Sequence, residues 1–544
     1  MEYIVPGVDL LRKGRGAPRV SESRSEAGTN SSTSWWTCIH RQHRLDPKPK
    51  PKPEHAIVPA RCSPIAPSHL SSMTAGRALL ALSRPSVTPC LRISPSSRLV
   101  RPRPSAFGAR AMSATTPRPD PFRPAKRVAG QRQDVWSIVN EAAAASPVQP
   151  IVNMGQGFFG YNPPKFAIDA AKDALDRVEC NQYSPTKGRP RLKKAIADAY
   201  SPFFGRSINP DTEVSITTGA NEGAGKGMLS AFMGFIEPGD EVIIFEPFFD
   251  QYISNIEMPG GTIRYVPLHP PKDGATRTSP ASEWTIDFQE LENTINPKTK
   301  MIVLNSPHNP VGKVFSREEL QRIGDLCVKH NLIILSDEVY DRLFYVPFTR
   351  IGTLSPELYE RTLTVGSAGK AFYATGWRVG YLIGPEHLIK YVAGAHTRIC
   401  YSSVSPLQEA AAVAFEKADE EGFWDESRNE MKQKMERFCQ VFEELGIPYS
   451  DPEGGYFVLA NMASVKLPAD YPFPPHVANR PRDFKLCWFL IHEVGVAAIP
   501  PTEFYTDANT HIAEDYLRFA VCKNDDVLET AKERLRGLKK YITQ

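Results

Sequence analysis

The sequence predicts an α/β fold in which a large domain, built on a mainly parallel sheet between helices, is followed by a smaller α+β domain. From residue 165 onward, short apolar runs alternate with segments of helical period, which is typical of βα units. After about residue 425 the pattern changes to a long charged helix followed by scattered short strands. The 544 residues also exceed what one simple core holds, so two globular domains are expected.

The elements are expected in the following order. Apolar residues recur at helical spacing over 165–178, and a second helix over 228–236 stops at Pro238-Gly239. Short apolar runs predict strands within residues 213–220, 241–247, 301–307, 332–340, 362–370 and 379–385. Further on we expect a helix over 425–445, strands in GGYFVLANM, GVAAIP and YLRFAVC, and a Pro-rich loop over 467–481. The predicted limits are 1–118 for a segment without a domain, 119–164 for an arm and part of the small domain, 165–424 for the large domain and 425–544 for the small domain.

The first 118 residues do not have the pattern of a domain. Their Pro-rich and Ser-rich stretches cannot bury enough apolar surface to offset the entropy of ordering. Between His55 and Pro119 the chain has no Asp, Glu or Lys, whereas Arg recurs, and this composition is typical of a mitochondrial transit peptide. Met73 opens the best candidate, with the preceding residues interpreted as untranslated, while a start at Met112 would give a cytosolic form. A plain disordered tail is the alternative, so mitochondrial and cytoplasmic locations both stay open.

The composition argues against several classes of protein and site. The net charge of +4 comes in part from the N-terminal segment and gives no reason to expect a nucleic-acid surface. None of the nine cysteines forms a Cys-x-x-Cys pair, which argues against a disulfide framework or a zinc ribbon, and we expect no metal. No run of about eighteen apolar residues occurs, so no membrane-spanning segment is expected.

Several predicted strands end in polar or Gly-rich residues, which is where ligands bind in open α/β sheets. Lys370 lies at the end of GSAGK, and a buried lysine that is held neutral is a nucleophile able to form a Schiff base. A surface lysine in a glycine-rich turn is the alternative. Asp337 in LSDEVYD follows an apolar strand and needs a cationic partner there, unless it caps a helix.

The segment SAGKAFYATGWRVGYLIG resembles the lysine segment of the fold-type I, class I/II aminotransferases, which use pyridoxal 5′-phosphate. The resemblance implies that Lys370 holds this cofactor as a Schiff base and then acts as general base, while Ser367 and Arg378 bind the cofactor phosphate. It also implies that Asp337 keeps the pyridine nitrogen protonated and that Tyr340 reaches the phenolic oxygen.

Three further motifs occur in the order of that family. Asn309-Pro310 resembles its Asn-Pro signature, which implies that Asn309 bonds the phenolic oxygen and contacts the substrate, with a plain turn as the alternative. The stretch TTGANEGAGKG precedes a helix and fails as a Walker A motif. As the phosphate turn of the family it implies the amides of Ala220 and Asn221 as donors. Phe249 is implied to stack on the pyridine ring, with ordinary core packing as the alternative.

The same resemblance assigns residues to the substrate. Arg518 in DYLRFAVC is implied to bind the α-carboxylate, with a surface arginine on an edge strand as the alternative. Gly157 matches a position whose backbone contacts substrate. Tyr183 matches a tyrosine that reaches the phosphate of the neighbouring subunit, which implies a homodimer with shared active sites. GQGF, NQYSPTKG, TTGANEG, EPFFDQY and GSAGKAFYATGWRVGY are most similar to the kynurenine aminotransferases of fungi. There, aromatic residues at the positions of Trp136 and Tyr401 line the substrate pocket, the second from the other subunit.

The resemblance covers roughly residues 125–544 and implies transfer of the amino group of L-kynurenine to a 2-oxo acid such as 2-oxoglutarate, giving kynurenic acid. Two departures leave the substrate fit open. The chain has GQGFFG where the family often has GQGFPD, and residues 270–283 look like an insertion. The alternatives are another class I/II aminotransferase (for aspartate, methionine or glutamine), a β-lyase, and an aminotransferase-like ligand-sensing regulator. The regulator would need a DNA-binding module, whose helix-turn-helix pattern residues 1–118 do not show.

The transit-peptide interpretation predicts that the mature mitochondrial protein lacks the Arg-rich segment. N-terminal sequencing of the protein purified from its own cells should find a first residue downstream of that segment, because transit peptides are removed after import. A mature chain that retains residues 73–110 intact would contradict the interpretation.

Overall fold

The structure is a computed structural model and describes residue 125, residues 135–220 and residues 226–542. The predictions made on residues 1–118, including the transit peptide and the two alternative starts, lie outside these ranges. The predicted donor Asn221 also lies outside them.

The larger sheet has eight strands in the order β2-β10-β9-β8-β7-β3-β4-β6. These are β2 (Val214–Thr217), β3 (Glu241–Glu246), β4 (Thr262–His269), β6 (Thr285–Ile286), β7 (Thr299–Asn305), β8 (Ile333–Asp337), β9 (Thr362–Ser367) and β10 (Gly380–Ile383). The neighbours from β9 to β4 pair in parallel, whereas β10 is antiparallel to both of its neighbours and β6 is antiparallel to β4. The mainly parallel sheet predicted from the sequence is therefore confirmed.

Each of the six predicted runs overlaps a strand of this sheet, but β4 and the two-residue strand β6 were not predicted. The first residues of β4 alternate only weakly between buried and exposed, and Pro267 within it is typical of strands near a sheet edge. The antiparallel direction of β10 follows from its connection. The chain leaves β9 through the four-residue helix α9 (Ala368–Ala371), and β10 begins at the same end of the sheet at which β9 finishes.

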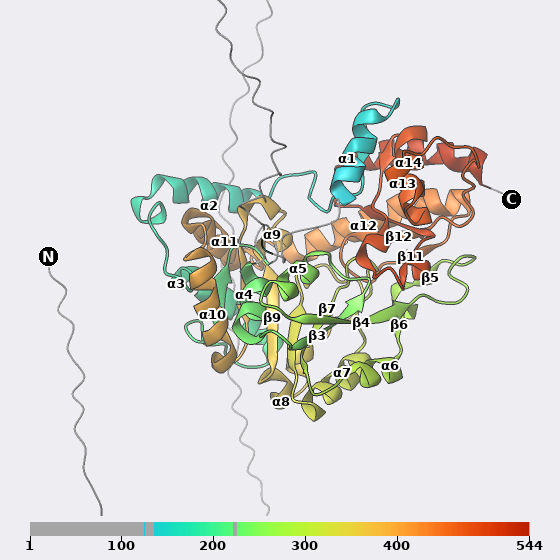
Figure 1. The fold of residues 1–544 in the computed structure, drawn as a ribbon. Coiled ribbons are helices and arrows are strands. Elements are labelled where there is room, and N and C mark those ends of the chain that lie inside the picture. Colours follow the sequence, from blue (N-terminus) through green and yellow to red (C-terminus); the bar gives the residue numbers. More distant parts are fainter. Residues whose placement is uncertain (1–124, 126–134, 221–225, 543–544) are drawn as a thin grey trace, which may run out of the picture. The chain divides into compact units, whose positions relative to one another are not determined.

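Both faces of this sheet are covered by helices (Figure 1). Along β3, Val242 and Ile244 belong to one apolar cluster, and Ile243 and Phe245 belong to another on the opposite face. This alternation, with every position buried, is expected for a strand between two helical layers. The helices of this part are α2 (Lys165–Asp176), α3 (Pro190–Phe204), α4 (Lys226–Phe235), α5 (Gln251–Glu257), α6 (Phe288–Thr294), α7 (Arg317–Lys329), α8 (Pro356–Tyr359), α10 (Glu386–Cys400) and α11 (Ser405–Ala418).

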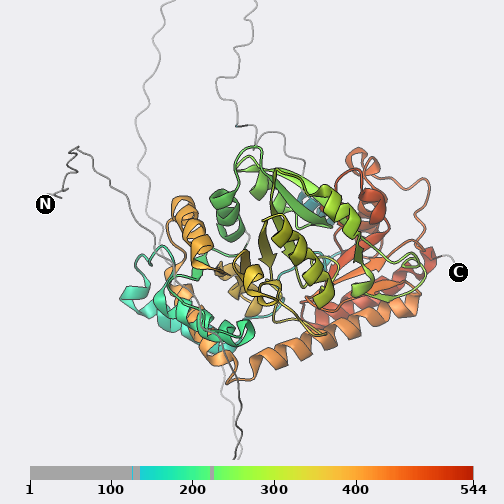
Figure 2. The same cartoon turned by 90° about the horizontal axis from the view of Figure 1, so that it is seen from below.

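The second part of the fold begins with the long helix α12 (Phe423–Leu445), drawn in orange along the lower side of Figure 2. A four-stranded sheet follows in the order β14-β12-β11-β5, with β14 (Tyr516–Ala520), β12 (Phe457–Asn461), β11 (Tyr449–Asp451) and β5 (Ser279–Pro280). A two-stranded parallel pair joins β1 (Val152–Asn153) to β13 (Val496–Ala497). Helix α1 (Val135–Ala145) packs on α14 (Arg482–Glu493), and α15 (Asp525–Leu535) packs on α12.

Two details differ from the sequence-based expectations. The predicted Pro-rich loop over 467–481 was wrong as a continuous loop, because it contains the short helix α13 (Pro475–Ala478). Proline is well tolerated at the first position of a helix, where its missing N–H would have no partner inside the helix. Residues 270–283 were expected to be an insertion. They contain strand β5, which pairs with β11 and so belongs to the small sheet. The domain limits themselves stay a prediction.

Candidate active site

A cavity of about 550 Å³ opens where several strands of the large sheet end. Strands β7, β8 and β9 contribute their last residues to its wall, namely Asn305, Asp337 and Ser367. Eleven of the fourteen residues predicted for the site line it: Trp136, Gly157, Ala220, Phe249, Asn309, Asp337, Tyr340, Ser367, Lys370, Arg378 and Arg518. The cavity therefore lies where ligands bind in open α/β sheets.

Lys370 lies in the single turn of α9, just after β9. The hydroxyl of Ser367 caps this turn by accepting a bond from the Lys370 amide at 3.2 Å. The Lys370 Nζ donates to the Tyr456 hydroxyl at 2.7 Å and to the Gly157 carbonyl at 3.2 Å. The alternative of a surface lysine in a glycine-rich turn is wrong, since the amine is directed inward to these two oxygens.

Asp337 ends β8 and is buried. The Tyr252 hydroxyl donates to its carboxylate at 2.5 Å, and the backbone N–H of Val339 donates at 3.4 Å. Burial raises the pKa of Asp337 to about 6, and these two hydrogen bonds and the charge of Lys370 oppose that rise. The chain continues from β8 into turns, so the alternative that Asp337 caps a helix is wrong. A buried carboxylate of this kind favours a cationic partner in the cavity.

Arg518 belongs to the edge strand β14, yet only 3% of its surface is exposed. Its guanidinium donates to the Asn309 side-chain oxygen at 3.0 Å and to the Gly155 carbonyl at 2.9 Å. No ion pair among the described residues includes Arg518, and its Nε has no hydrogen-bond partner there. Burial lowers the pKa of Arg518 to about 10. The surface-arginine alternative is therefore wrong, and the buried cation suits an anionic ligand.

Arg378 has a positive φ of 56°, which is uncommon outside glycine. Its guanidinium lies against Gly219 in the turn before α4, where a Cβ atom would come within 2.2 Å of the Arg378 Nη2. Its Nη1 donates to the Thr375 carbonyl at 2.9 Å. Only glycine at 219 leaves room for this close approach, and the approach brings Arg378 beside the predicted phosphate turn.

The aromatic wall of the cavity includes Trp136, Phe158, Phe249, Phe457 and Phe504. The rings of Phe249 and Tyr252 meet edge to face at 5.8 Å. The Arg518 guanidinium carbon lies over the face of the Phe457 ring, 4.4 Å from the ring centroid. Flat apolar walls with one buried cation at the end fit an amino acid with a planar side chain.

Two predicted residues do not line this cavity. The side chains of Tyr183 and Tyr401 are 87% and 55% exposed, and their rings contact each other edge to face at 5.7 Å. The resemblance assigns both to the site of a neighbouring subunit, so their separation from this chain's own cavity does not test that role. The homodimer stays a prediction.

Sequence reasoning gave no role to several residues that build the site. The Lys523 Nζ donates to the carbonyls of Gln156 and Phe158, both at 2.8 Å, and so holds the segment on either side of Gly157. Tyr456 and Tyr252 contact Lys370 and Asp337 directly. All three are distant in sequence from the groups they contact, and nothing in the local period of their segments distinguishes them from core residues.

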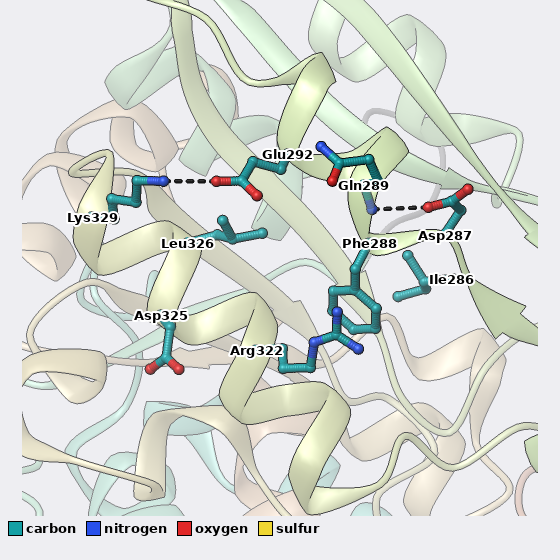
Figure 3. Close-up of a pocket in the computed structure, with 9 residues that line it drawn as sticks. All are labelled: Ile286, Asp287, Phe288, Gln289, Glu292, Arg322, Asp325, Leu326 and Lys329. Atoms are coloured by element: carbon teal, nitrogen blue, oxygen red, sulfur yellow. Dashed lines mark hydrogen bonds and ion pairs between the residues drawn. The ribbon is translucent and has the colours of Figure 1, made fainter.

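A separate hollow of about 680 Å³ lies between α6 and α7 (Figure 3). The Lys329 Nζ and the Glu292 carboxylate form an ion pair at 2.7 Å there, and the Arg322 guanidinium lies 3.6 Å above the Phe288 ring. The charged side chains of this hollow therefore have partners within the chain, as in an ordinary solvated groove. Within residues 135–220 and 226–542, no cluster of three His, Cys, Asp or Glu side chains is suited to a metal ion. Over the same residues, no helix is long and apolar enough to cross a membrane.

The chain is similar to known proteins over most of its described length. The sequence profile of the family described as "Aminotransferase class I and II" matches residues 149–535. The chain is 52% identical over 418 residues to the "Probable kynurenine–oxoglutarate transaminase BNA3" of Saccharomyces cerevisiae, covering 75% of this chain and 93% of that protein. It is 36% identical to kynurenine–oxoglutarate transaminase 3 of Homo sapiens, covering 76% of this chain and 90% of that protein.

Solved structures of aminotransferases are also similar to this chain. The crystal structure of Bna3p from Saccharomyces cerevisiae has a TM-score of 0.74 and 51% identity, covering 76% of this chain and 97% of that one. YbdL of Escherichia coli, described as having a methionine aminotransferase function, has a TM-score of 0.67 and 25% identity, covering 76% of this chain and 100% of that one.

Replacing Asp337 with Asn should change how the stability of the unliganded protein depends on pH. The folded-state pKa of about 6 lies above the ordinary 3.8, so between these pH values the folded chain keeps a proton that the unfolded chain has lost. The wild-type free energy of unfolding should therefore fall by about 3 kcal/mol relative to Asp337→Asn as the pH rises through this window. Above about pH 6 the difference should be constant.

Urea unfolding of both proteins between about pH 3.5 and 7.5 measures this difference. A difference that does not change with pH would show that the Asp337 carboxyl titrates alike in the folded and unfolded chains.

Proposed function

The chain belongs to the class I and II aminotransferases, and on this premise we propose that it moves the amino group of L-kynurenine to a 2-oxo acid with pyridoxal phosphate as cofactor. The observation that carries the proposal is the meeting of Lys370, Asp337 and Arg518 in one cavity. The choice of kynurenine is supported by the printed names of relatives such as the one that is 52% identical. The aromatic wall of the cavity suits such a donor.

The residues around the cavity fit the cofactor. Asp337 is a buried carboxylate whose raised pKa calls for a cation, and a protonated pyridine nitrogen supplies one. Ser367 and Arg378 also line the cavity, and Arg378 lies against Gly219 in the turn before α4, where a side chain would fill the room that its guanidinium takes. A helix N-terminus with a neighbouring arginine suits a phosphate group. When bound, the cofactor would supply an electron sink for the α-carbon of the amino acid.

The chain's own residues then have distinct tasks. Arg518 binds the α-carboxylate of the amino acid and so orients the α-carbon, with Asn309 fixing one edge of the guanidinium. The Nζ of Lys370 would hold the cofactor. Once released from it, the amine would remove the α-proton of the amino acid and deliver it to the carbon that keeps the amino group. Asp337 keeps its partner nitrogen protonated, and Tyr252 holds the Asp337 carboxylate in place. Tyr340, which also lines the cavity, would hold the phenolic oxygen of the cofactor.

The proposal extends to the assembly and the compartment. Tyr183 and Tyr401 are exposed aromatic side chains near one another, and a second copy of the chain would bury them against its own site. The Arg-rich composition that precedes the fold supports mitochondrial import, with a cytosolic form from the later start.

Replacing Lys370 with Ala should abolish turnover, because no other group in the wall replaces its amine as the base. The loss expected for such a group is at least about 1,000-fold in kcat. The absorbance that pyridoxal phosphate gains when it bonds to a lysine should be lost as well. A matched control is Lys329→Ala, which removes an exposed lysine of α7 from its pair with Glu292. Full activity in the Lys370 variant would refute the assignment.

A panel of amino donors tests the substrate. With purified protein and 2-oxoglutarate, kcat/KM should be higher for kynurenine than for aspartate, because a planar apolar side chain matches the wall and a second carboxylate does not. Glutamine and methionine complete the panel, since other members of the family use such donors. A preference for aspartate would leave the chain an aminotransferase but overturn kynurenine as its donor.

A further inference from the structure

Tyr456 lies immediately before β12 and is fully buried, yet its hydroxyl reaches the amine of Lys370. Its ring packs against those of Phe159 and Tyr340, both with centroids 5.2 Å away, and against Phe457 at 4.7 Å. Three aromatic neighbours leave the ring no other position, so the hydroxyl oxygen is fixed relative to the fold.

Besides the amine, the Tyr456 hydroxyl has two hydrogen-bond partners, the Gly157 carbonyl and the Tyr340 hydroxyl. Burial raises the pKa of Tyr456 well above its usual value, so the phenol keeps its one hydrogen. The hydroxyl can donate that hydrogen to the Gly157 carbonyl at 2.9 Å, and its lone pairs then face the Lys370 Nζ at 2.7 Å. The amine in turn donates to the same carbonyl at 3.2 Å, which closes a triangle of three polar groups.

The Gly157 carbonyl, the second acceptor of the Lys370 amine, is also fixed in place. Lys523 bonds the carbonyls before and after Gly157, both at 2.8 Å. A Cβ at Gly157 would come within 2.8 Å of the Phe457 ring, so the backbone here packs directly on β12. Both oxygens that face the amine are therefore fixed before any ligand arrives.

We propose that Tyr456 is a positioning residue for Lys370, which holds the amine, before it bonds to the cofactor, with two of its hydrogens directed to fixed oxygens and so in one orientation toward the reacting carbon. The inference rests on the proposed function, in which Lys370 bonds to the cofactor aldehyde. In that step the nitrogen forms a double bond to the aldehyde carbon, and the carbonyl oxygen leaves as water with both hydrogens of the neutral amine. An amine held in advance loses less freedom in this step.

The test is the rate at which the cofactor-free enzyme bonds to pyridoxal phosphate, followed by absorbance, in wild type and Tyr456→Phe. The variant keeps the ring and removes one oxygen. Losing one hydrogen bond to a charged or reacting amine should slow the bonding step about ten-fold. The affinity for pyridoxamine phosphate should stay within about two-fold, because that form has no aldehyde and does not bond to Lys370. In turnover, kcat should fall more than KM rises.

Tyr449→Phe is the matched control, because it removes the hydroxyl of another buried tyrosine, which bonds Glu443 on α12 at 2.9 Å, and Tyr449 does not line the cavity. Its bonding rate should equal that of the wild type. An unchanged rate in Tyr456→Phe would overturn the inference while leaving the proposed function intact. Equal losses of bonding rate and of pyridoxamine phosphate affinity would also overturn it, since they indicate a general structural role. If the wild type itself shows no absorbance change with pyridoxal phosphate, the proposed function fails.

Discussion

Four consecutive backbone carbonyls, those of residues 155–158, hold three basic side chains around the cavity. Gly155 accepts from Arg518, Gln156 and Phe158 accept from Lys523, and Gly157 accepts from Lys370. The segment follows β1, whereas Lys370 follows β9 of the large sheet, and the other two side chains come from β14 and the residues just after it. Neutral carbonyls accept the hydrogens of these basic groups without supplying a negative charge, so the buried Arg518 guanidinium keeps its preference for an anion.

The same cavity also contains a buried acidic side chain, that of Asp337. Asp337 is buried with a phenol as its nearest donor, and its raised pKa reflects how little the surroundings compensate the charge. A ligand with an anionic end and a cationic ring would satisfy both Arg518 and Asp337. Such uncompensated groups lower the stability of the unliganded protein, and binding of the complementary ligand recovers that energy. Charges that the chain itself leaves uncompensated are typical of a ligand-binding site, whereas a structural ion-pair network compensates its own charges.

The chain has Phe159-Gly160 where the family often has Pro-Asp, and the structure shows what these two residues contact. Phe159 does not line the cavity but packs among Tyr161, Tyr373 and Tyr456, behind the hydroxyl that contacts Lys370. A Cβ at Gly160 would come within 2.9 Å of the Asn524 backbone nitrogen, so the two backbone segments pack closely there. The exchange of Pro-Asp for Phe-Gly thus alters the support behind the lysine and leaves the substrate wall to other residues, including Phe158.

The sequence by itself identified six strands of the large sheet, because a strand buried on both faces is mostly apolar, as in β7 and β8, but it did not identify β4. It also identified the residues that end those strands, such as Asp337 and Ser367, since polar groups after an apolar run are local signals. Only the tertiary structure decided that Tyr456, Tyr252 and Lys523 contact the site, and that Arg518 is buried although its strand lies at an edge. These contacts join residues 85 to 367 positions apart, and no local period encodes which distant group a side chain meets.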